Sequence, residues 1–155
     1  MKGSISILII SILLTSCGLK NSNAEIKTKS LPIVGTWRLL TGTVIQNGDT
    51  TVTDYTKNIS FIKIINDTHF AFLKHNIANT KDSSNEFDSG GGRYTLKDSA
   101  YTEHLDYCLE KEWEGHKFDF MITINNDTLI QSGMEKFDGT DINRLNVEKY
   151  VRLKD

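Results

Sequence analysis

The sequence predicts an all-β domain, a small antiparallel up-and-down barrel of eight or nine strands that follows an N-terminal export signal. Three observations support this prediction. Short runs rich in β-branched and aromatic residues recur at near-regular spacing, apolar and polar side chains alternate within them, and turn-forming residues separate them. A helical alternative fails in the window 117–124, where every second residue from Phe118 to Ile124 is apolar and only Met121 breaks the pattern.

The N-terminal segment has the features of an export signal. Lys2 is the only charged residue before position 17, and an apolar stretch runs over residues 5–14. Because about ten apolar residues cross only about half of the ~30 Å hydrocarbon core of a bilayer, we expect removal of this segment rather than a permanent transmembrane helix. The order Leu14-Thr15-Ser16-Cys17 follows and resembles the lipobox of bacterial lipoproteins, in which the cysteine thiol receives a diacylglyceryl group. The resemblance implies lipidation of Cys17 and a chain that is anchored to a membrane without spanning it.

The chain therefore divides into three expected parts: a signal peptide over residues 1–16, a lipidated cysteine and flexible tether over 17–32, and one barrel domain over 33–155. The tether is polar and lacks a helical apolar period, and Pro32 marks its end. Removal of the signal peptide leaves 139 residues, a typical domain length, and changes the formal net charge from −2 to −3. This weak acidity offers no electrostatic surface for nucleic acid. We expect the domain in the cell envelope, anchored most simply to the outer membrane, in the periplasm or at the cell surface.

Nine segments carry the strand pattern. In order, they are 34–45, 50–55, 59–65, 68–75, 92–97, 100–107, 117–124, 128–134 and 147–153. Turns are expected between consecutive strands at 48–49, 66–67, 98–99 and 125–127, where asparagine, aspartate, serine and glycine gather. The polar run 76–89 and the segment 137–144 are predicted loops.

Two features at the ends of the domain resemble a known family. Gly35-x-Trp37 opens the first strand, Arg152 closes the last one, and the glycine-rich segment 90–96 lies between them. Together they resemble the uncharacterised lipocalin-like domains of envelope lipoproteins from Gram-negative bacteria, over residues 34–153. In that superfamily the early tryptophan packs against a late arginine, which implies a barrel floor made by Gly35, Trp37 and Arg152. The disulfides of many lipocalins and the helix beside their barrel have no counterpart in this sequence.

Alternation along the strands predicts which side chains face the barrel interior. If Tyr101 and Tyr107 point inward, Glu103 must point inward too, because all three share one face of a strand. The resemblance places the face of the last strand that carries Tyr150 and Arg152 inside as well. A cavity of this kind, apolar with a few polar groups, is typical of small-molecule sites. The candidate ligand-binding residues are Tyr94, Leu96, Tyr101, Glu103, Tyr107, Phe118, Phe120, Tyr150 and Arg152.

Glu103 and Arg152 are expected to enter the barrel from different strands. Because an isolated charge in a low-dielectric interior is costly, each needs a partner, and the other residue is the simplest candidate. A buried pair would make the floor rigid. An unpaired Arg152 beside an open cavity would instead offer two parallel hydrogen bonds to a ligand carboxylate.

Two functions remain open. The first is a membrane-anchored binding protein that holds a small, largely apolar ligand in the barrel. The second is an interaction or inhibitor-like protein with a filled barrel that binds an envelope protein through loops 76–92 and 137–144. The volume of the interior distinguishes the two hypotheses.

Catalysis and metal binding have little support in the sequence. Glu103 and His104 are neighbours in a strand and face opposite ways, and no nucleophile with an aligned base is visible. The four histidines are scattered along the strands without the spacing of metal ligands, and no cofactor motif occurs. With Cys17 lipidated, Cys108 is the only other cysteine, so no intramolecular disulfide is expected. We therefore expect no enzyme, no metal and no cofactor.

Overall fold

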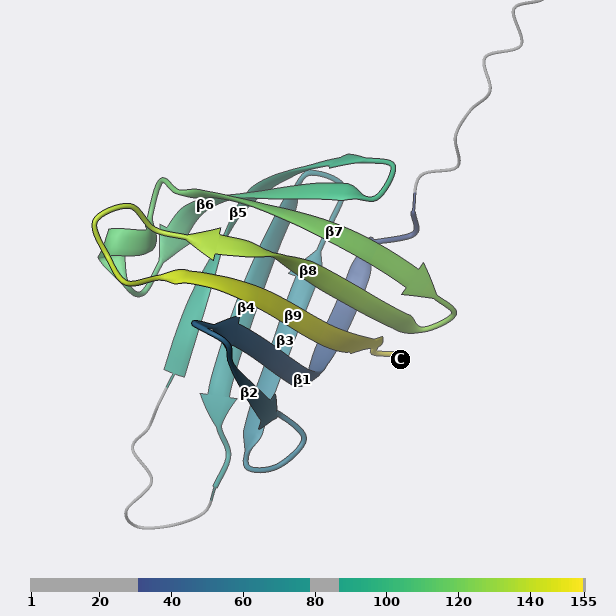
Figure 1. Ribbon diagram of the computed structural model, residues 1–155. Helices are drawn as coiled ribbons and strands as arrows, with labels where there is room; N and C mark the ends of the chain where they lie inside the picture. The colour runs from purple at the N-terminus through teal and green to yellow at the C-terminus, as the bar shows by residue number, and fades with distance from the viewer. Residues whose placement is uncertain (1–30, 79–86, 155) are drawn as a thin grey trace, which may run out of the picture.

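The computed structural model describes residues 31–78 and 87–154, which form one antiparallel sheet and one short 3-10 helix (Figure 1). The elements are β1 (Gly35–Gln46), β2 (Asp49–Asp54), β3 (Ile59–Ile65), β4 (His69–Asn76), β5 (Phe87–Lys97), β6 (Ala100–Cys108), η1 (Lys111–Trp113), β7 (Lys117–Asn125), β8 (Thr128–Lys136) and β9 (Asn143–Arg152). Within these two ranges no helix has the length and apolarity that a membrane crossing requires. The predicted signal peptide, Cys17, most of the tether and part of the predicted loop 76–89 lie outside the described residues.

The sheet closes into a barrel because β1 pairs along both of its edges. From β3 to β9 each strand pairs with the next, and β9 then pairs with β1. The other edge of β1 pairs with β3 along its N-terminal half and with β2 along its C-terminal half. Eight strands thus form the closed barrel, and β2 extends the sheet where β3 diverges from β1 (Figure 1). The predicted all-β, up-and-down barrel is confirmed.

The predicted strands agree closely with the observed ones, because the turns between them have the expected chemistry. Asp98 and Asn126 sit in the predicted hairpin turns and adopt positive φ angles of 55° and 53°, which aspartate and asparagine tolerate better than most residues. The largest difference is at β5, which begins at Phe87 and includes the three glycines 90–92. These glycines are paired with both neighbouring strands, although the predicted strand began only at residue 92. A Cβ on Gly91 would lie 2.5 Å from the carbonyl oxygen of Phe70, so close strand packing requires glycine there.

A β-bulge in β6 reverses the alternation near the end of that strand. Leu105 and Tyr107 lie opposite consecutive residues of β5, so Asp106 is the extra residue. Its carboxylate accepts two hydrogen bonds of 3.0 Å from the Arg93 guanidinium. As a result Tyr107 points outward and is 71% exposed, whereas Cys108 lines the interior. The prediction that Tyr107 faces the interior is therefore wrong, because an inserted residue shifts the phase of every residue that follows.

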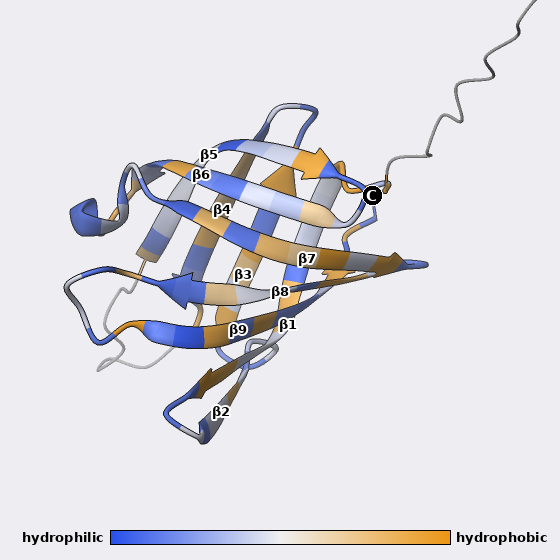
Figure 2. Ribbon diagram, turned by 45° about the horizontal axis from the view of Figure 1, so that its top comes forward, coloured by the Kyte–Doolittle hydropathy of each residue, from blue (hydrophilic) through white to orange (hydrophobic). Residues whose placement is uncertain are grey.

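The hydrophobic core fills one end of the barrel. Apolar and polar residues alternate along the strands around it (Figure 2). The largest fully buried side chains are Trp37, Leu39, Tyr101, Ile122, Leu129 and Tyr150. The indole Nε1 of Trp37 donates a 2.8 Å hydrogen bond to the carbonyl oxygen of Ile33. The Arg152 guanidinium lies 4.0 Å from the centre of the Trp37 ring and donates to two carbonyl oxygens of the segment that enters β1. At Gly35, φ is 146° and a Cβ would collide with that guanidinium, so this position requires glycine. The structure thus brings the three predicted floor residues, Gly35, Trp37 and Arg152, together at the closed end.

Candidate functional site

The other half of the barrel is hollow. It contains a cavity of about 420 Å³, which lies within the usual range for small-molecule sites. Every barrel strand contributes at least one residue to the wall, and Thr53 of β2 and Trp113 of η1 contribute at the end away from Trp37. The interior is therefore divided between a packed floor and an unfilled upper part.

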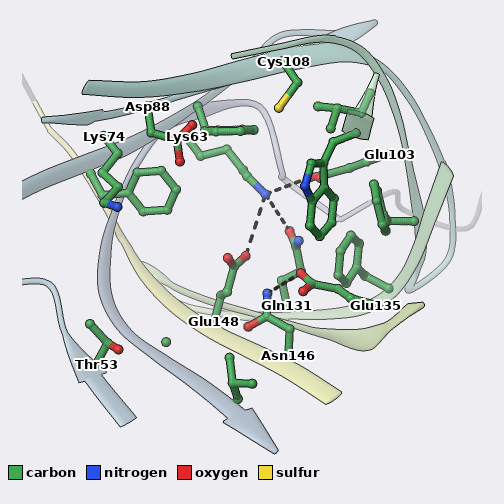
Figure 3. Close-up of a pocket in the computed structure, with 18 of the residues that line it drawn as sticks. Thr53, Lys63, Lys74, Asp88, Glu103, Cys108, Gln131, Glu135, Asn146 and Glu148 are labelled. Carbon is green, nitrogen blue, oxygen red and sulfur yellow. Dashed lines mark hydrogen bonds and ion pairs between the residues drawn. The ribbon is translucent and has the colours of Figure 1, made fainter. Parts of the chain in front are cut away.

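Lys63 is the centre of a polar cluster at the bottom of this cavity, formed with Glu103, Gln131 and Glu148 (Figure 3). The four residues occupy inward-facing positions on β3, β6, β8 and β9. Lys63 Nζ donates to Glu103 Oε1 at 2.7 Å and to Gln131 Oε1 at 3.1 Å, and it lies 3.9 Å from Glu148 Oε2. Lys63, Glu103 and Gln131 are 4%, 7% and 3% exposed, so these polar groups are almost completely removed from bulk solvent.

The protein itself holds the Lys63 ammonium on all sides. Nζ donates hydrogen bonds to Glu103 and Gln131, and the Glu148 carboxylate adds an ion-pair contact at 3.9 Å. The rings of Phe70 and Tyr150 lie 5.7 and 5.4 Å from Nζ, within the range of cation–π contacts. The Tyr150 hydroxyl also donates a 2.7 Å hydrogen bond to Glu148 Oε2. Lys63 is thus a structural cation whose donors are directed to protein acceptors.

Two carboxylates share this one ammonium, and the excess of negative charge shifts several pKa values. Burial lowers the pKa of Lys63, but the nearby Glu103 and Glu148 outweigh that effect and raise it overall. For Glu103, burial is the largest influence and raises the pKa of the carboxyl even though Lys63 opposes the shift. The pKa values of Tyr101 and Tyr150 are raised as well, first by burial and then by the neighbouring carboxylates. The Tyr101 hydroxyl is buried near Glu103 and makes no hydrogen bond of ordinary geometry with any described residue.

Aromatic rings form two parts of the cavity wall. On β3 and β4, the ring of Phe61 lies 5.6 Å from that of Tyr55 and 5.9 Å from that of Phe72. Near β7, Trp113 lies 5.7 Å from Phe118. Two strands separate β4 from β7 on one side of the barrel and three separate β3 from β7 on the other, so the two groups face each other across the cavity. A planar or apolar molecule between them would contact aromatic surface on both sides.

A second polar group lies higher on the wall, on β8 and β9. The Glu135 carboxylate accepts a 2.7 Å hydrogen bond from Arg144 Nε through one oxygen. Its other oxygen accepts a 2.7 Å hydrogen bond from Asn146 Nδ2 (Figure 3). Both oxygens of Glu135 are therefore engaged by the protein. This carboxylate differs in that respect from Glu148, whose contacts with Lys63 and Tyr150 both involve Oε2.

The cavity brings together four of the nine predicted ligand-binding residues: Glu103, Phe118, Phe120 and Tyr150. Tyr94, Leu96 and Tyr101 belong to the closed end, where they are part of the core or pack against it. Tyr107 lies on the outer surface and Arg152 covers Trp37, so neither lines this cavity.

The predicted pairing of Glu103 with Arg152 is wrong. Arg152 lies two residues beyond Tyr150, at the level where the barrel closes, and its guanidinium donates to backbone carbonyl oxygens there. Glu103 is paired with Lys63 instead, at 2.7 Å. Arg152 is accordingly not positioned to receive a ligand carboxylate in the cavity.

Sequence reasoning missed Lys63, Gln131 and the aromatic residues of β3 and β4. The signal for Lys63 was present, because it lies between Phe61 and Ile65 on one face of β3. Ile62 and Ile64 make the opposite face equally apolar, however, so the phase of this strand could not be assigned from alternation. Trp113 belongs to a short helix in a connection for which no structure was predicted.

The geometry offers no metal centre: within residues 31–78 and 87–154, no three histidine, cysteine or acidic side chains gather in a group that could hold an ion. No protein-family model matches the sequence, and no curated protein matches it. A solved structure described as a lipocalin-like protein from Bacteroides uniformis is similar to this chain at 16% sequence identity. The alignment covers 77% of this chain and 97% of that one, with a TM-score of 0.46.

Proposed function

We propose that this domain binds a small, largely apolar organic molecule inside its barrel, and that lipid on Cys17 anchors it to a membrane of the cell envelope. The cavity of about 420 Å³ carries the proposal. Its wall combines facing aromatic groups with one buried polar cluster, which is the composition expected of a small-molecule site. Anchoring is supported by the order Leu14-Thr15-Ser16-Cys17, which lies outside the described residues.

The partial burial of inward-facing aromatic rings supports binding over a filled barrel. Phe61, Phe72 and Trp113 face the interior, yet each keeps part of its surface accessible. Protein interiors are normally packed as densely as organic crystals, so inward apolar surface without a neighbour is unusual. A ligand that covered this surface would contribute about 25 cal/mol for each Å² of apolar area removed from water.

We also propose that the domain acts without catalysis. Cys108 lines the cavity, but burial raises the pKa of its thiol, whereas a nucleophilic cysteine needs a lowered one. The pKa of Lys63 is raised as well, which keeps the amine protonated and unreactive as a nucleophile. The two most obvious nucleophiles of the cavity are therefore in their unreactive forms at neutral pH.

A fluorescence titration with the neutral probe N-phenyl-1-naphthylamine tests binding in the cavity. Two valine-to-tryptophan variants form a matched pair: Val44→Trp adds a bulky ring to the cavity wall, and Val52→Trp adds the same ring at a position on β2 that is 64% exposed. We expect saturable probe fluorescence with the parent and with Val52→Trp, and a strong reduction with Val44→Trp. No saturable signal with the parent, or equal signals with both variants, would contradict binding inside the barrel.

A further inference from the structure

The chemistry of the cavity floor also indicates which ligand charge this site accepts, an inference that rests on the proposed function. An unpaired lysine in a barrel would attract a ligand carboxylate. Here Nζ already faces Glu103 Oε1, Gln131 Oε1 and Glu148 Oε2 at 2.7, 3.1 and 3.9 Å. The two neighbouring carboxylates already balance the charge of this ammonium, and an incoming anion would have to approach it past Glu103 and Glu148.

The charges that line the cavity favour a cation. Five carboxylates line it, namely Asp88, Glu103, Glu110, Glu135 and Glu148, against the three cations Lys63, Lys74 and Arg144. Among the described residues, Arg144 is already paired with Glu135, and Lys63 is shared between Glu103 and Glu148. A positively charged ligand would reduce this excess of negative charge, and an anionic ligand would increase it.

One carboxylate has an oxygen available to a ligand. Glu148 is 17% exposed, and Figure 3 shows its carboxylate directed into the cavity toward Lys63. Its contacts with Lys63 and Tyr150 both use Oε2, and no described residue donates a hydrogen bond to Oε1. Because a hydrogen bond between an ammonium and a carboxylate is about twice as strong as a neutral one, Oε1 is a suitable acceptor for a protonated amine.

A second polar group at the floor is also incompletely used. Gln131 lines the cavity and is only 3% exposed. Its Oε1 accepts a hydrogen bond from Lys63. Its amide nitrogen donates to no described residue. A buried amide normally satisfies its donors, so two unused N–H groups beside the cavity indicate a ligand with an acceptor, such as a hydroxyl or carbonyl oxygen.

We propose that the cavity selects small organic amines in their protonated form, with the ammonium group on Glu148 Oε1 and the apolar or aromatic body between the rings of Phe61, Phe72 and Trp113. Aromatic rings around an ammonium add cation–π attraction to the ion pair. Glu148 is the counter-ion of the ligand, and Lys63 fixes the floor on which that counter-ion is held.

Competition against N-phenyl-1-naphthylamine tests this selection with three matched compounds at pH 7.5. 2-Phenylethylamine is a cation, 2-phenylethanol is neutral, and 3-phenylpropanoate is an anion of similar size. We expect the purified full-length protein to bind the amine about tenfold or more tightly than the alcohol, and the anion most weakly. An alcohol or anion that binds as tightly as the amine overturns the charge selection.

Two substitutions then identify the counter-ion. Glu148→Gln keeps an acceptor for the Tyr150 hydroxyl but removes the charge, so it should weaken the amine about tenfold and leave the alcohol unchanged. Asp119→Asn removes a charge from a side chain that is 73% exposed, and it should leave both affinities unchanged. Equal amine affinity in the parent and Glu148→Gln overturns the role of Glu148. If neither the fluorescent probe nor any of the three compounds binds, both the proposed function and the charge selection fail. If the probe binds but the amine, the alcohol and the anion compete equally well, only the charge selection is overturned.

Discussion

Replacing Lys63 with methionine tests the polar cluster on which the cavity floor depends. Methionine keeps most of the apolar stem but removes a charge-assisted hydrogen bond to Glu103 and a hydrogen bond to Gln131. Breaking a buried ion pair by removal of one partner typically costs about 3–5 kcal/mol, because the other charge is left without compensation. We expect Lys63→Met to reduce the free energy of unfolding by about this amount at pH 7.

The loss of unfolding free energy in Lys63→Met should depend on pH, because the unpaired Glu103 carboxylate becomes neutral when it takes up a proton. Protonating a carboxyl with an unfolded pKa of 4.5 costs about 3 kcal/mol at pH 7 and less than about 1 kcal/mol at pH 5, at 1.36 kcal/mol per unit. In the variant the folded pKa of Glu103 lies further above its unfolded value. The folded state then binds more protons than the unfolded state between these two values, so stability falls as pH rises through this window. The variant should recover most of its loss at pH 5.

Urea unfolding at pH 5, 6, 7 and 8 measures this effect. Lys149→Met, on the exposed side of β9, is the matched control and should stay within about 0.5 kcal/mol of the parent. Lys63→Met combined with Glu103→Gln removes the isolated charge, so it should be more stable than the single variant at pH 7 and less dependent on pH. A loss below about 1 kcal/mol at pH 7 without pH dependence would refute the buried cluster.

Three further predictions concern the floor, the tyrosines and the anchor. Trp37→Ala should destabilise the domain by about 3–5 kcal/mol in urea unfolding, because the ring is fully buried under Arg152; a melting temperature equal to that of the parent would contradict this packing. Because the pKa values of Tyr101 and Tyr150 are raised, the folded state keeps protons that the unfolded state releases near pH 10. The free energy of unfolding should therefore fall as pH rises above 10, and it should fall less steeply in Tyr150→Phe. Titration of all five tyrosines together near pH 10 in the folded protein, followed by absorbance, would oppose that result. Cys17→Ser should move the protein from the membrane fraction to the soluble fraction, and an unchanged distribution would remove the lipid anchor.

The strands and their order could be predicted because each depends on local information. Alternation identifies a strand, and residues such as Asp98 and Asn126 identify the turns, so the meander follows from neighbouring segments alone. The closed barrel was predicted from the number and regular spacing of the strands. The resemblance gave the floor residues Gly35, Trp37 and Arg152, which the structure brings into contact.

The cavity was predicted less well. Which residues line it depends on the phase of the alternation along each strand and on contacts between strands. A single extra residue at Asp106 turned Tyr107 outward and Cys108 inward, and alternation alone gives no warning of a bulge. Glu103 was expected inside and is inside, but its partner was not predicted. Lys63 and Arg152 both lie opposite Trp37 on the strands beside β1, yet Lys63 pairs with Glu103 and Arg152 donates to backbone carbonyl oxygens. Alternation within a single strand does not reveal such partners.

Native mass spectrometry of the soluble Cys17→Ser protein, purified without detergent, tests most directly whether the barrel is a binding site. We expect a population that is heavier than the bare chain by the mass of a small molecule and that loses this mass on collisional activation. This population should be reduced when Val44→Trp is added and retained when Val52→Trp is added. A bare chain mass for the Cys17→Ser protein under gentle conditions, unchanged after incubation with the fluorescent probe or the amine, would contradict it.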